Sequence, residues 1–315
     1  MKWSVKAPAN IALIKYMGKA PGNQNIPLNA SLSYTLPHLL THVELEENTL
    51  QQDTWEPLTQ QASYIPHVFS EKAQTRFLNH LRLIKQQFAC DTYFTIRSAN
   101  NFPHGTGLAS SASSFAALTQ AAIKACAACT NTSIPSITEQ ARLSRIGSGS
   151  SCRSFFEPWA IWDETSVKSI TLPYPKLIHQ VILVEQAEKK VSSSEAHQRV
   201  SRLPEYPARK IRAEKNLTAL IHALQNQAWD EAHQITWREF QDMHALFSAS
   251  EPAFSYITPE TQQLLDMLQQ AFKQQDGPLI TMDAGPNIHL LYRPDQIQLA
   301  NTFKQQALEN QLHVL

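Results

Sequence analysis

The stretch NNFPHGTGLASSASS at residues 100–114 guides the interpretation of the whole chain, because it holds two of only eight glycines in 315 residues. Small hydroxyl residues follow the glycines, and an alanine-rich segment then predicts a helix over 108–129. A glycine loop that enters a helix presents free backbone N–H groups beside the positive end of the helix dipole. The stretch therefore predicts a phosphate-binding loop. The alternative is an Ala/Ser-rich helix suited only to close packing.

The remaining glycines also lie in short polar segments rather than being scattered. The segments are YMGKAPG at 16–22, PHGTGLASS at 103–111, RIGSGSSCR at 145–153 and DGPLITMDAGPN at 276–287. Glycine is needed where φ is positive or where the backbone must approach another group closely. Because Ser, Lys and Arg accompany these glycines, we expect the segments to build one shared site. Four ordinary turns are the alternative.

Composition limits the class of protein. Hydrophobic residues make up 43% and charged residues 17%, as in an ordinary globular protein. Lys+Arg and Asp+Glu both number 27, so the balanced charge does not favour nucleic acid or an anionic membrane as a partner. No apolar run reaches the length of a membrane span, and the N-terminal stretch lacks the features of a signal peptide. We expect the four cysteines to be reduced thiols in a cytoplasmic protein, and Cys126 and Cys129 to be core residues rather than zinc or redox groups.

Strand and helix patterns interleave along the chain. Strands are predicted at 3–7, 41–47, 93–99, 179–185, 278–284 and 288–294, and helices at 72–88, 108–129, 136–146, 208–226, 229–247, 259–275 and 294–309. This order predicts an α/β or α+β layered fold. The stretch LPYPK at 172–176 separates strand signals on its two sides, so we expect domains at 1–176 and 177–315.

Several motifs in order resemble those of a known family. PHGTGLASSAS resembles the PxxxGLxSSA phosphate loop of the GHMP kinase superfamily. APANIALIKYMGK at 7–19, SGSSCRS at 148–154, VSSSEAH at 191–197 and MDAGPN at 282–287 are similar to segments of its diphosphomevalonate decarboxylase family. The resemblance implies a two-domain GHMP-type fold with the active site in the cleft between the domains.

The resemblance also implies a reaction, namely the ATP-dependent decarboxylation of (R)-5-diphosphomevalonate in the mevalonate route to isoprenoids. The products would be isopentenyl diphosphate, CO₂, ADP and phosphate. ATP and Mg²⁺ are implied, although no protein ligand for the metal is assigned, and the family suggests a homodimer. Two alternatives stay open. One is a kinase or decarboxylase that acts on another phosphorylated mevalonate, including a monophosphate. The other is a non-catalytic superfamily member that serves as a binding protein.

Three residues are candidates for the chemistry. Asp283 lies between the apolar run PLITM and the AGPN turn, so its carboxylate sits at a strand end. By family match it orients or deprotonates the 3-hydroxyl, whereas the alternative is a residue that caps the turn. Lys15 would lie near that hydroxyl and keep Asp283 ionised. Arg153 would grip the substrate carboxylate. The alternatives are an exposed lysine and a surface ion pair.

The same match suggests binding residues. For the substrate they are Tyr16, Met17, Gly18, Lys19, Ser148, Gly149, Ser150, Ser151, Cys152, Arg153 and Ser194. For ATP they are Gly105, Thr106, Gly107, Leu108, Ala109, Ser110, Ser111 and Ser113.

The chain also departs from the family pattern. Met17 stands where Trp is usual, Ala20 where Arg is usual, and His197 where Met is frequent. Lys72 or Arg76 is left as the candidate for a basic residue that the family places on this helix. These departures leave open whether the substrate is the diphosphate or a monophosphate.

Overall fold

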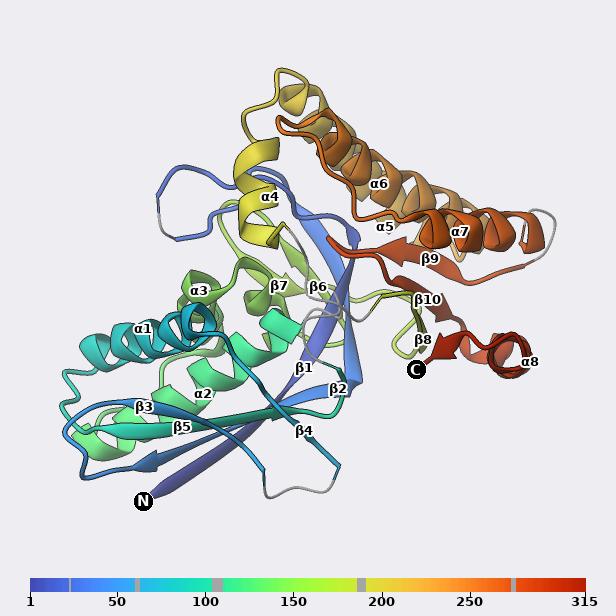
Figure 1. The fold of residues 1–315 in the computed structure, drawn as a ribbon. Helices are drawn as coiled ribbons and strands as arrows, with labels where there is room; N and C mark the ends of the chain where they lie inside the picture. Colours follow the sequence, from blue (N-terminus) through green and yellow to red (C-terminus); the bar gives the residue numbers. More distant parts are fainter. Residues whose placement is uncertain (23, 60–62, 104–109, 186–190, 273–275) are drawn as a thin grey trace.

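The computed structural model contains two β-sheets, each covered by its own helices (Figure 1). It describes all residues except 23, 60–62, 104–109, 186–190 and 273–275. Among the described residues, no helix combines the length and the apolar character that crossing a membrane requires.

The larger sheet lies in the N-terminal half of the chain. Its strands are β1 (Lys2–Ile14), β2 (Ser31–Glu47), β3 (Thr54–Pro57), β4 (Ile65–Pro66), β5 (Phe94–Asn100), β6 (Trp159–Trp162) and β7 (Val167–Ser169). The strand order is β3-β5-β2-β6-β7, with β1 paired to β2 and β4 to β5. Every pair is antiparallel except β3 with β5. The last residues of β1 are buried without alternation because packed groups cover both of its faces.

Helices gather on one side of this sheet (Figure 1). They are α1 (Glu71–Gln87), α2 (Ser110–Thr130) and α3 (Ile137–Gly147), followed by the 3₁₀ segment η1 (Gly149–Phe155). The alanines of α2 let this helix approach β1 and β2 closely, so that most of the helix is buried. Ser136, the first residue of the helix predicted over 136–146, caps the start of α3. Cys126 is a buried free thiol of this core and Cys129 is a half-buried one, which fits the prediction of core residues.

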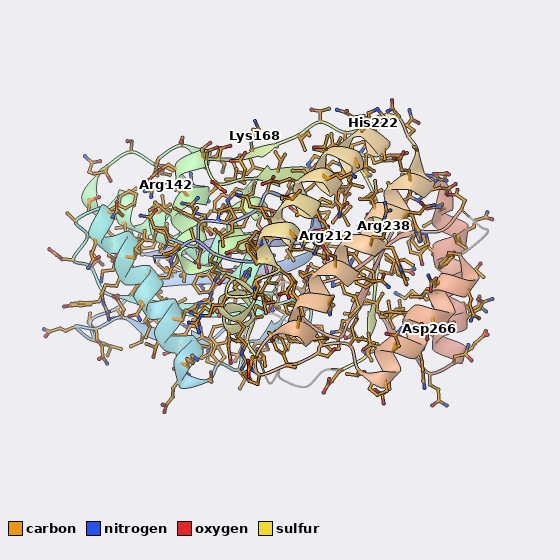
Figure 2. All side chains as sticks on the ribbon, turned by 90° about the horizontal axis from the view of Figure 1, so that it is seen from above. Arg142, Lys168, Arg212, His222, Arg238 and Asp266 are labelled. Atoms are coloured by element: carbon orange, nitrogen blue, oxygen red, sulfur yellow. The ribbon has the colours of Figure 1, made fainter. Side chains whose placement is uncertain are left out.

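The smaller sheet lies in the C-terminal half. Its antiparallel strands β8 (Ile178–Leu183), β9 (Leu279–Met282), β10 (Ile288–Tyr292) and β11 (His313–Val314) have the order β11-β8-β10-β9. The accompanying helices are α4 (Ser193–Val200), α5 (Tyr206–Gln225), α6 (Trp229–Ala249), α7 (Pro259–Ala271) and α8 (Ile297–Glu309), with a short 3₁₀ turn η2 (Pro294–Gln296). Charged residues on the outer faces of these helices, such as Arg212, Arg238 and Asp266, are exposed (Figure 2).

One hydrophobic cluster joins the two halves. It contains Ile11 and Leu13 of β1, Leu220 and Ala223 of α5, and Leu279 of β9. Because α6 also packs against both β1 and β9, the ends of these two strands are held close together. This shared core places the residues that follow β1 opposite those that follow β9.

The expected α/β architecture is confirmed, since two sheets with their own helices pack around a shared core. Each predicted strand and helix has a counterpart, whereas the short elements β3, β4, β6, β7, β11 and α4 carried too few residues to give a periodic signal. The division of the chain at residue 176 stays a prediction.

Candidate active site

A cleft of about 300 Å³ lies where the segments that follow β1 and β9 meet η1, α4 and the start of α2. The predicted residues that line it are Lys15, Tyr16, Met17, Lys19, Ser110, Ser111, Ser148, Gly149, Ser150, Arg153, Ser194 and Asp283. A larger hollow of about 680 Å³ beside α6 and α7 is lined by other residues and by none of these. The smaller cleft is therefore the candidate active site.

Lys15 and Asp283 form an ion pair at the base of the cleft. Lys15 Nζ lies 2.8 Å from Asp283 Oδ1, although the two residues are 268 positions apart. Burial lowers the pKa of the Lys15 ammonium, while the charge of Asp283 acts in the opposite direction. Burial alone would raise the pKa of Asp283, but Lys15, together with His289 and Arg153, outweighs it and holds the pKa of this carboxyl below its ordinary value. Asp283 is therefore an ionised carboxylate at neutral pH.

Arg153 lies on the neighbouring wall and is held rigidly. Its Nε donates to Asn10 Oδ1 at 3.1 Å, and its Nη1 donates to Ser31 Oγ at 2.8 Å. The guanidinium also lies over the ring of Trp162, 5.6 Å from the ring centre. Only 3% of Arg153 is exposed, yet no carboxylate contacts it among the described residues. The arrangement leaves a buried cation whose preferred partner is an anion brought into the cleft.

The turn after β1 is fixed by contacts from distant residues. Asn29 Nδ2 donates to the backbone oxygen of Lys15 at 2.9 Å, and the Tyr206 hydroxyl donates to that of Met17 at 2.6 Å. Gly18 has φ of +89°, and a Cβ built there would lie 2.3 Å from the Tyr206 oxygen. Glycine is thus required at this position both by the backbone conformation and by the close approach.

The opposite end of the cleft is rich in cations and hydrogen-bond donors. Burial, followed by the charge of Arg76, lowers the pKa of Lys19 to about 8. Arg76 of α1 lines the cleft, whereas Lys72 is not among the lining residues described. Arg76 is therefore the better candidate for the basic residue that the sequence left open. His197 Nδ1 accepts a hydrogen bond from the Gly18 N–H at 2.9 Å, so the neutral ring carries its proton on Nε2. Burial holds the pKa of His197 well below its ordinary value, with Lys19 adding to the effect.

Four predicted ligand residues do not line the cleft and are instead hydrogen-bonded inside the protein. One is Gly18, whose N–H donates to His197. Ser113 Oγ lies 2.7 Å from Thr41 Oγ1, Ser151 Oγ donates to the Ser148 backbone oxygen, and Cys152 Sγ donates to that of Gly149. Sequence cannot distinguish these roles, because a small hydroxyl or thiol suits an internal turn as well as a ligand. The predicted residues Gly105, Thr106, Gly107, Leu108 and Ala109 lie outside the described residues.

Sequence reasoning also missed several residues of the site. Ser192 and Ser193 line the cleft beside the predicted Ser194, at the start of α4. Asn10 donates both to Ser154 Oγ and to the Ser150 backbone oxygen, and so joins β1 to η1. Asn10 stands in the APANIALIK motif, and this position was the only available signal for it.

The fold and the site together define a GHMP-type enzyme with a cationic cleft between two sheets. Residues 7–171 match the family described as diphosphomevalonate decarboxylase-like N-terminal domain, and residues 180–312 match the mevalonate 5-diphosphate decarboxylase C-terminal domain. The chain therefore belongs to the diphosphomevalonate decarboxylase family.

Individual relatives agree with this membership. The crystal structure of a mevalonate diphosphate decarboxylase from Legionella pneumophila is 51% identical, covers all of both chains and has a TM-score of 0.93. A solved protein named MDDEF, in complex with MVAPP, AMPPCP and magnesium, is 30% identical with a TM-score of 0.85, and the match covers 100% of this chain and 96% of that chain. Diphosphomevalonate decarboxylase of Candida albicans is 29% identical over 312 residues, which make up 92% of this chain and 83% of the relative.

Proposed function

We propose that this protein converts (R)-5-diphosphomevalonate and ATP into isopentenyl diphosphate, CO₂, ADP and phosphate. The observation that carries the proposal is the Lys15–Asp283 pair, 2.8 Å apart, beside the buried Arg153 in a cleft rich in cations. The site thus offers one ionised carboxylate for proton transfer and several cations for an anionic substrate.

Asp283 acts on the tertiary 3-hydroxyl of the substrate. Its carboxylate accepts the hydroxyl hydrogen bond and takes the proton as the oxygen attacks the terminal phosphorus of ATP. ADP leaves with the electron pair of the broken P–O bond. Lys15 keeps Asp283 ionised before this step, and its ammonium, 2.8 Å from that carboxylate, stabilises the negative charge that develops on the transferring phosphoryl group.

The second half of the reaction breaks two bonds of the phosphorylated substrate. The C3–O bond breaks and the phosphate leaves with its electron pair, which develops positive charge at C3. The bond to the carboxylate then breaks, CO₂ departs, and its electron pair becomes the new double bond. Arg153, fixed by Asn10 and Ser31, orients the carboxylate for this step.

The cationic end of the cleft suits the diphosphate group. Lys19, Arg76 and the neutral N–H of His197 line it, together with the serine hydroxyls at the start of α4. The Tyr16 hydroxyl is buried with no hydrogen-bond partner among the described residues, so a ligand oxygen would satisfy it.

ATP fits at the start of α2, where Ser110 and Ser111 face the cleft. The described residues bring together no cluster of three His, Cys, Asp or Glu that could hold a metal ion. Mg²⁺ would therefore arrive on the phosphates of ATP, with the two serine hydroxyls as neutral oxygen donors nearby. When bound, it would neutralise charge on the phosphates.

Three further expectations belong to this proposal. The chain divides into domains at 1–176 and 177–315, forms a homodimer and works in the cytoplasm. The positions of β7 and β8 support the division, since one ends at Ser169 and the other begins at Ile178. Light scattering of the purified protein tests the dimer, because a homodimer has twice the mass of the chain, 35.5 kDa.

The decisive experiment incubates the protein with ATP, Mg²⁺ and a panel of phosphorylated mevalonates. We expect CO₂ and phosphate to appear together, at equal amounts, with the 5-diphosphate. A product that keeps phosphate on C3 without release of CO₂ would instead identify a kinase. Preference for the 5-monophosphate would identify that compound, rather than the 5-diphosphate, as the substrate. Binding without turnover of any compound would contradict an enzymatic function.

A further inference from the structure

We propose that Glu239, a buried carboxylate on α6, is a positioning residue that holds the main chain of Lys15 and adds a second negative charge to its surroundings. The inference rests on the proposed role of Lys15 at the reacting hydroxyl. Nothing in the sequence around Glu239 suggests such a role, because it stands within the ordinary helical segment TWREFQD, at 236–242.

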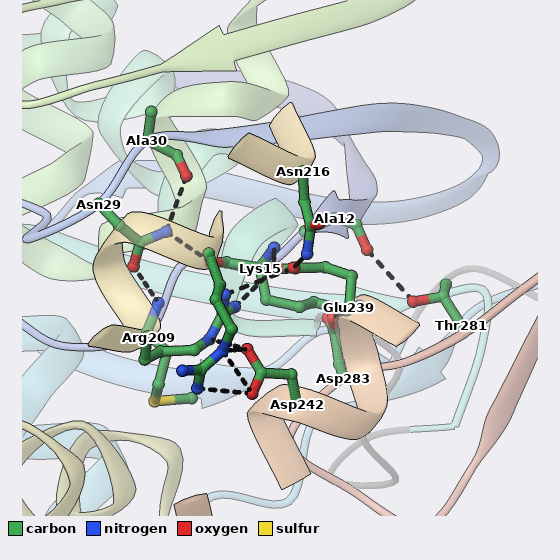
Figure 3. Close-up of polar contacts among 12 residues, drawn as sticks. Ala12, Lys15, Asn29, Ala30, Arg209, Asn216, Glu239, Asp242, Thr281 and Asp283 are labelled. Atoms are coloured by element: carbon green, nitrogen blue, oxygen red, sulfur yellow. Dashed lines mark hydrogen bonds and ion pairs between the residues drawn. The ribbon is translucent and has the colours of Figure 1, made fainter. Parts of the chain in front are cut away.

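The first observation is a contact between Glu239 and the main chain of Lys15. The Lys15 backbone N–H donates to Glu239 Oε1 at 3.0 Å, across 224 residues of sequence (Figure 3). Strand β1 ends at Ile14, so this donor lies just beyond the last residue of the strand. The carboxylate satisfies the donor at the point where the chain leaves the sheet, and thereby sets the direction in which the Lys15 side chain begins.

The second observation is that Glu239 is itself held on both oxygens. Arg209 of α5 donates to Oε1 at 2.5 Å and to Oε2 at 3.4 Å, and Asn216 donates to Oε2 at 2.7 Å. Figure 3 shows Arg209, Asn216 and the main chain of Lys15 meeting at the Glu239 carboxylate. Glu239 and Arg209 are both 0% exposed. Their side chains are therefore held in one arrangement. Through the hydrogen bond from the Lys15 N–H, this arrangement also restricts the main chain of Lys15.

Stability alone does not explain why the buried pair between Arg209 and Glu239 is charged. Removing two charges from water costs about as much as their attraction returns, so an apolar pair of similar size would usually stabilise the fold equally well. A carboxylate at this place does something that an apolar side chain cannot, since it accepts the Lys15 N–H and places negative charge near a buried ammonium.

The charges that surround Lys15 come from three elements. Asp283 follows β9, Arg153 lies on η1, and Glu239 lies on α6. Burial is the largest influence and lowers the pKa of Lys15, and Arg153 lowers it further, whereas Asp283 and Glu239 both raise it. Glu239 therefore helps to keep Lys15 protonated in a setting that favours the neutral amine.

The test replaces Glu239 with glutamine, which keeps the shape and the acceptor oxygen but removes the charge. The titration of Lys15 is followed through its Cε signal by NMR of protein labelled with ¹³C-lysine, and the signal is assigned with Lys15→Arg. We expect the midpoint in Glu239→Gln to fall below that of the wild type. We also expect kcat to fall by about tenfold to hundredfold, with KM for ATP little changed. Glu231→Gln, on the exposed face of the same helix, is the matched control.

The titration does not depend on turnover, so it separates this proposal from the proposed function. An unmoved midpoint would overturn the proposal even if kcat fell, because Glu239 would then serve the fold alone. If Glu239→Gln does not fold, the double variant Arg209→Met/Glu239→Gln removes both buried charges. Because loss of the Arg209 cation offsets part of the effect, a smaller downward shift in the Lys15 midpoint is expected. A midpoint equal to that of the wild type in this variant would also overturn it.

Discussion

Replacing Asp283 with asparagine separates the chemistry of this site from its binding. The variant keeps the size of the side chain and an acceptor oxygen, but it can no longer take a proton from the 3-hydroxyl. Loss of a general base costs about a hundredfold to ten-thousandfold in rate. Substrate and ATP should bind at least as tightly as before, because both are anions and a negative charge has left the cleft.

The variant also breaks the ion pair between Asp283 and Lys15, which should lower the free energy of unfolding. Asp283 Oδ1 lies 2.8 Å from the ammonium, and the aspartate side chain is 26% exposed. Breaking a fully buried pair costs about 3–5 kcal/mol, so the partial exposure places the loss nearer 2–3 kcal/mol. This loss should shrink as the pH rises toward 10, since Lys15 in the variant has a folded pKa further below its unfolded value. The unfolded chain then binds more protons, and stability rises with pH.

The assay measures ADP release at saturating substrate, with binding followed by calorimetry and stability by urea unfolding. A substrate already phosphorylated on C3 should restore much of the decarboxylation, because the base acts before that step. Asp266→Asn, on the outer face of α7, is the matched control (Figure 2). Normal turnover by a folded Asp283→Asn protein would refute the reasoning. Failure on the phosphorylated substrate as well would move the role of Asp283 to the second half of the reaction.

Three other predictions concern the walls of the site and the fold beneath it. Arg153→Lys loses the forked hydrogen bonds, so KM for the mevalonate substrate should rise by about tenfold or more while KM for ATP stays constant. A variant with the same KM for the mevalonate substrate as the wild type would contradict the role of Arg153 in holding the substrate carboxylate. Gly18→Ala should weaken substrate binding and lower the melting temperature because its Cβ meets Tyr206, whereas Gly22→Ala, which also has positive φ but open space, should leave substrate binding intact. Burial, followed by Arg76, lowers the pKa of His80 to about 3, so the native state binds fewer protons than the unfolded chain below the ordinary value of 6.5. His80→Gln should therefore reduce the stability lost between pH 7 and pH 5 by about 2 kcal/mol, measured by urea unfolding, and an unchanged loss would show that His80 titrates normally.

Much of the architecture was predictable because its signals are local. The helices α1, α2, α5 and α6 show apolar spacing over many residues, and the capping residue Ser136 marks the start of α3. The short strands β6 and β7 were missed, since three or four residues give no reliable period. Strand β1 extends well past its predicted end. The prediction stopped short because the last residues of the strand are buried on both faces and lack the alternation that identifies a strand.

The sequence by itself determined the parts of the site that lie within motifs. Lys15 stands in the motif APANIALIKYMGK at 7–19, and Arg153 and Asp283 stand in glycine-containing segments. Both the residue types and the turn chemistry are readable there. The tertiary structure decided which neighbours make these groups effective. Asn29 and Glu239 stand outside those segments, yet both hold the main chain of Lys15. The physical reason is that the burial and the electrostatic surroundings of a residue depend on segments that are distant in the sequence but packed beside it. A local sequence pattern carries no information about which distant residue will contact it.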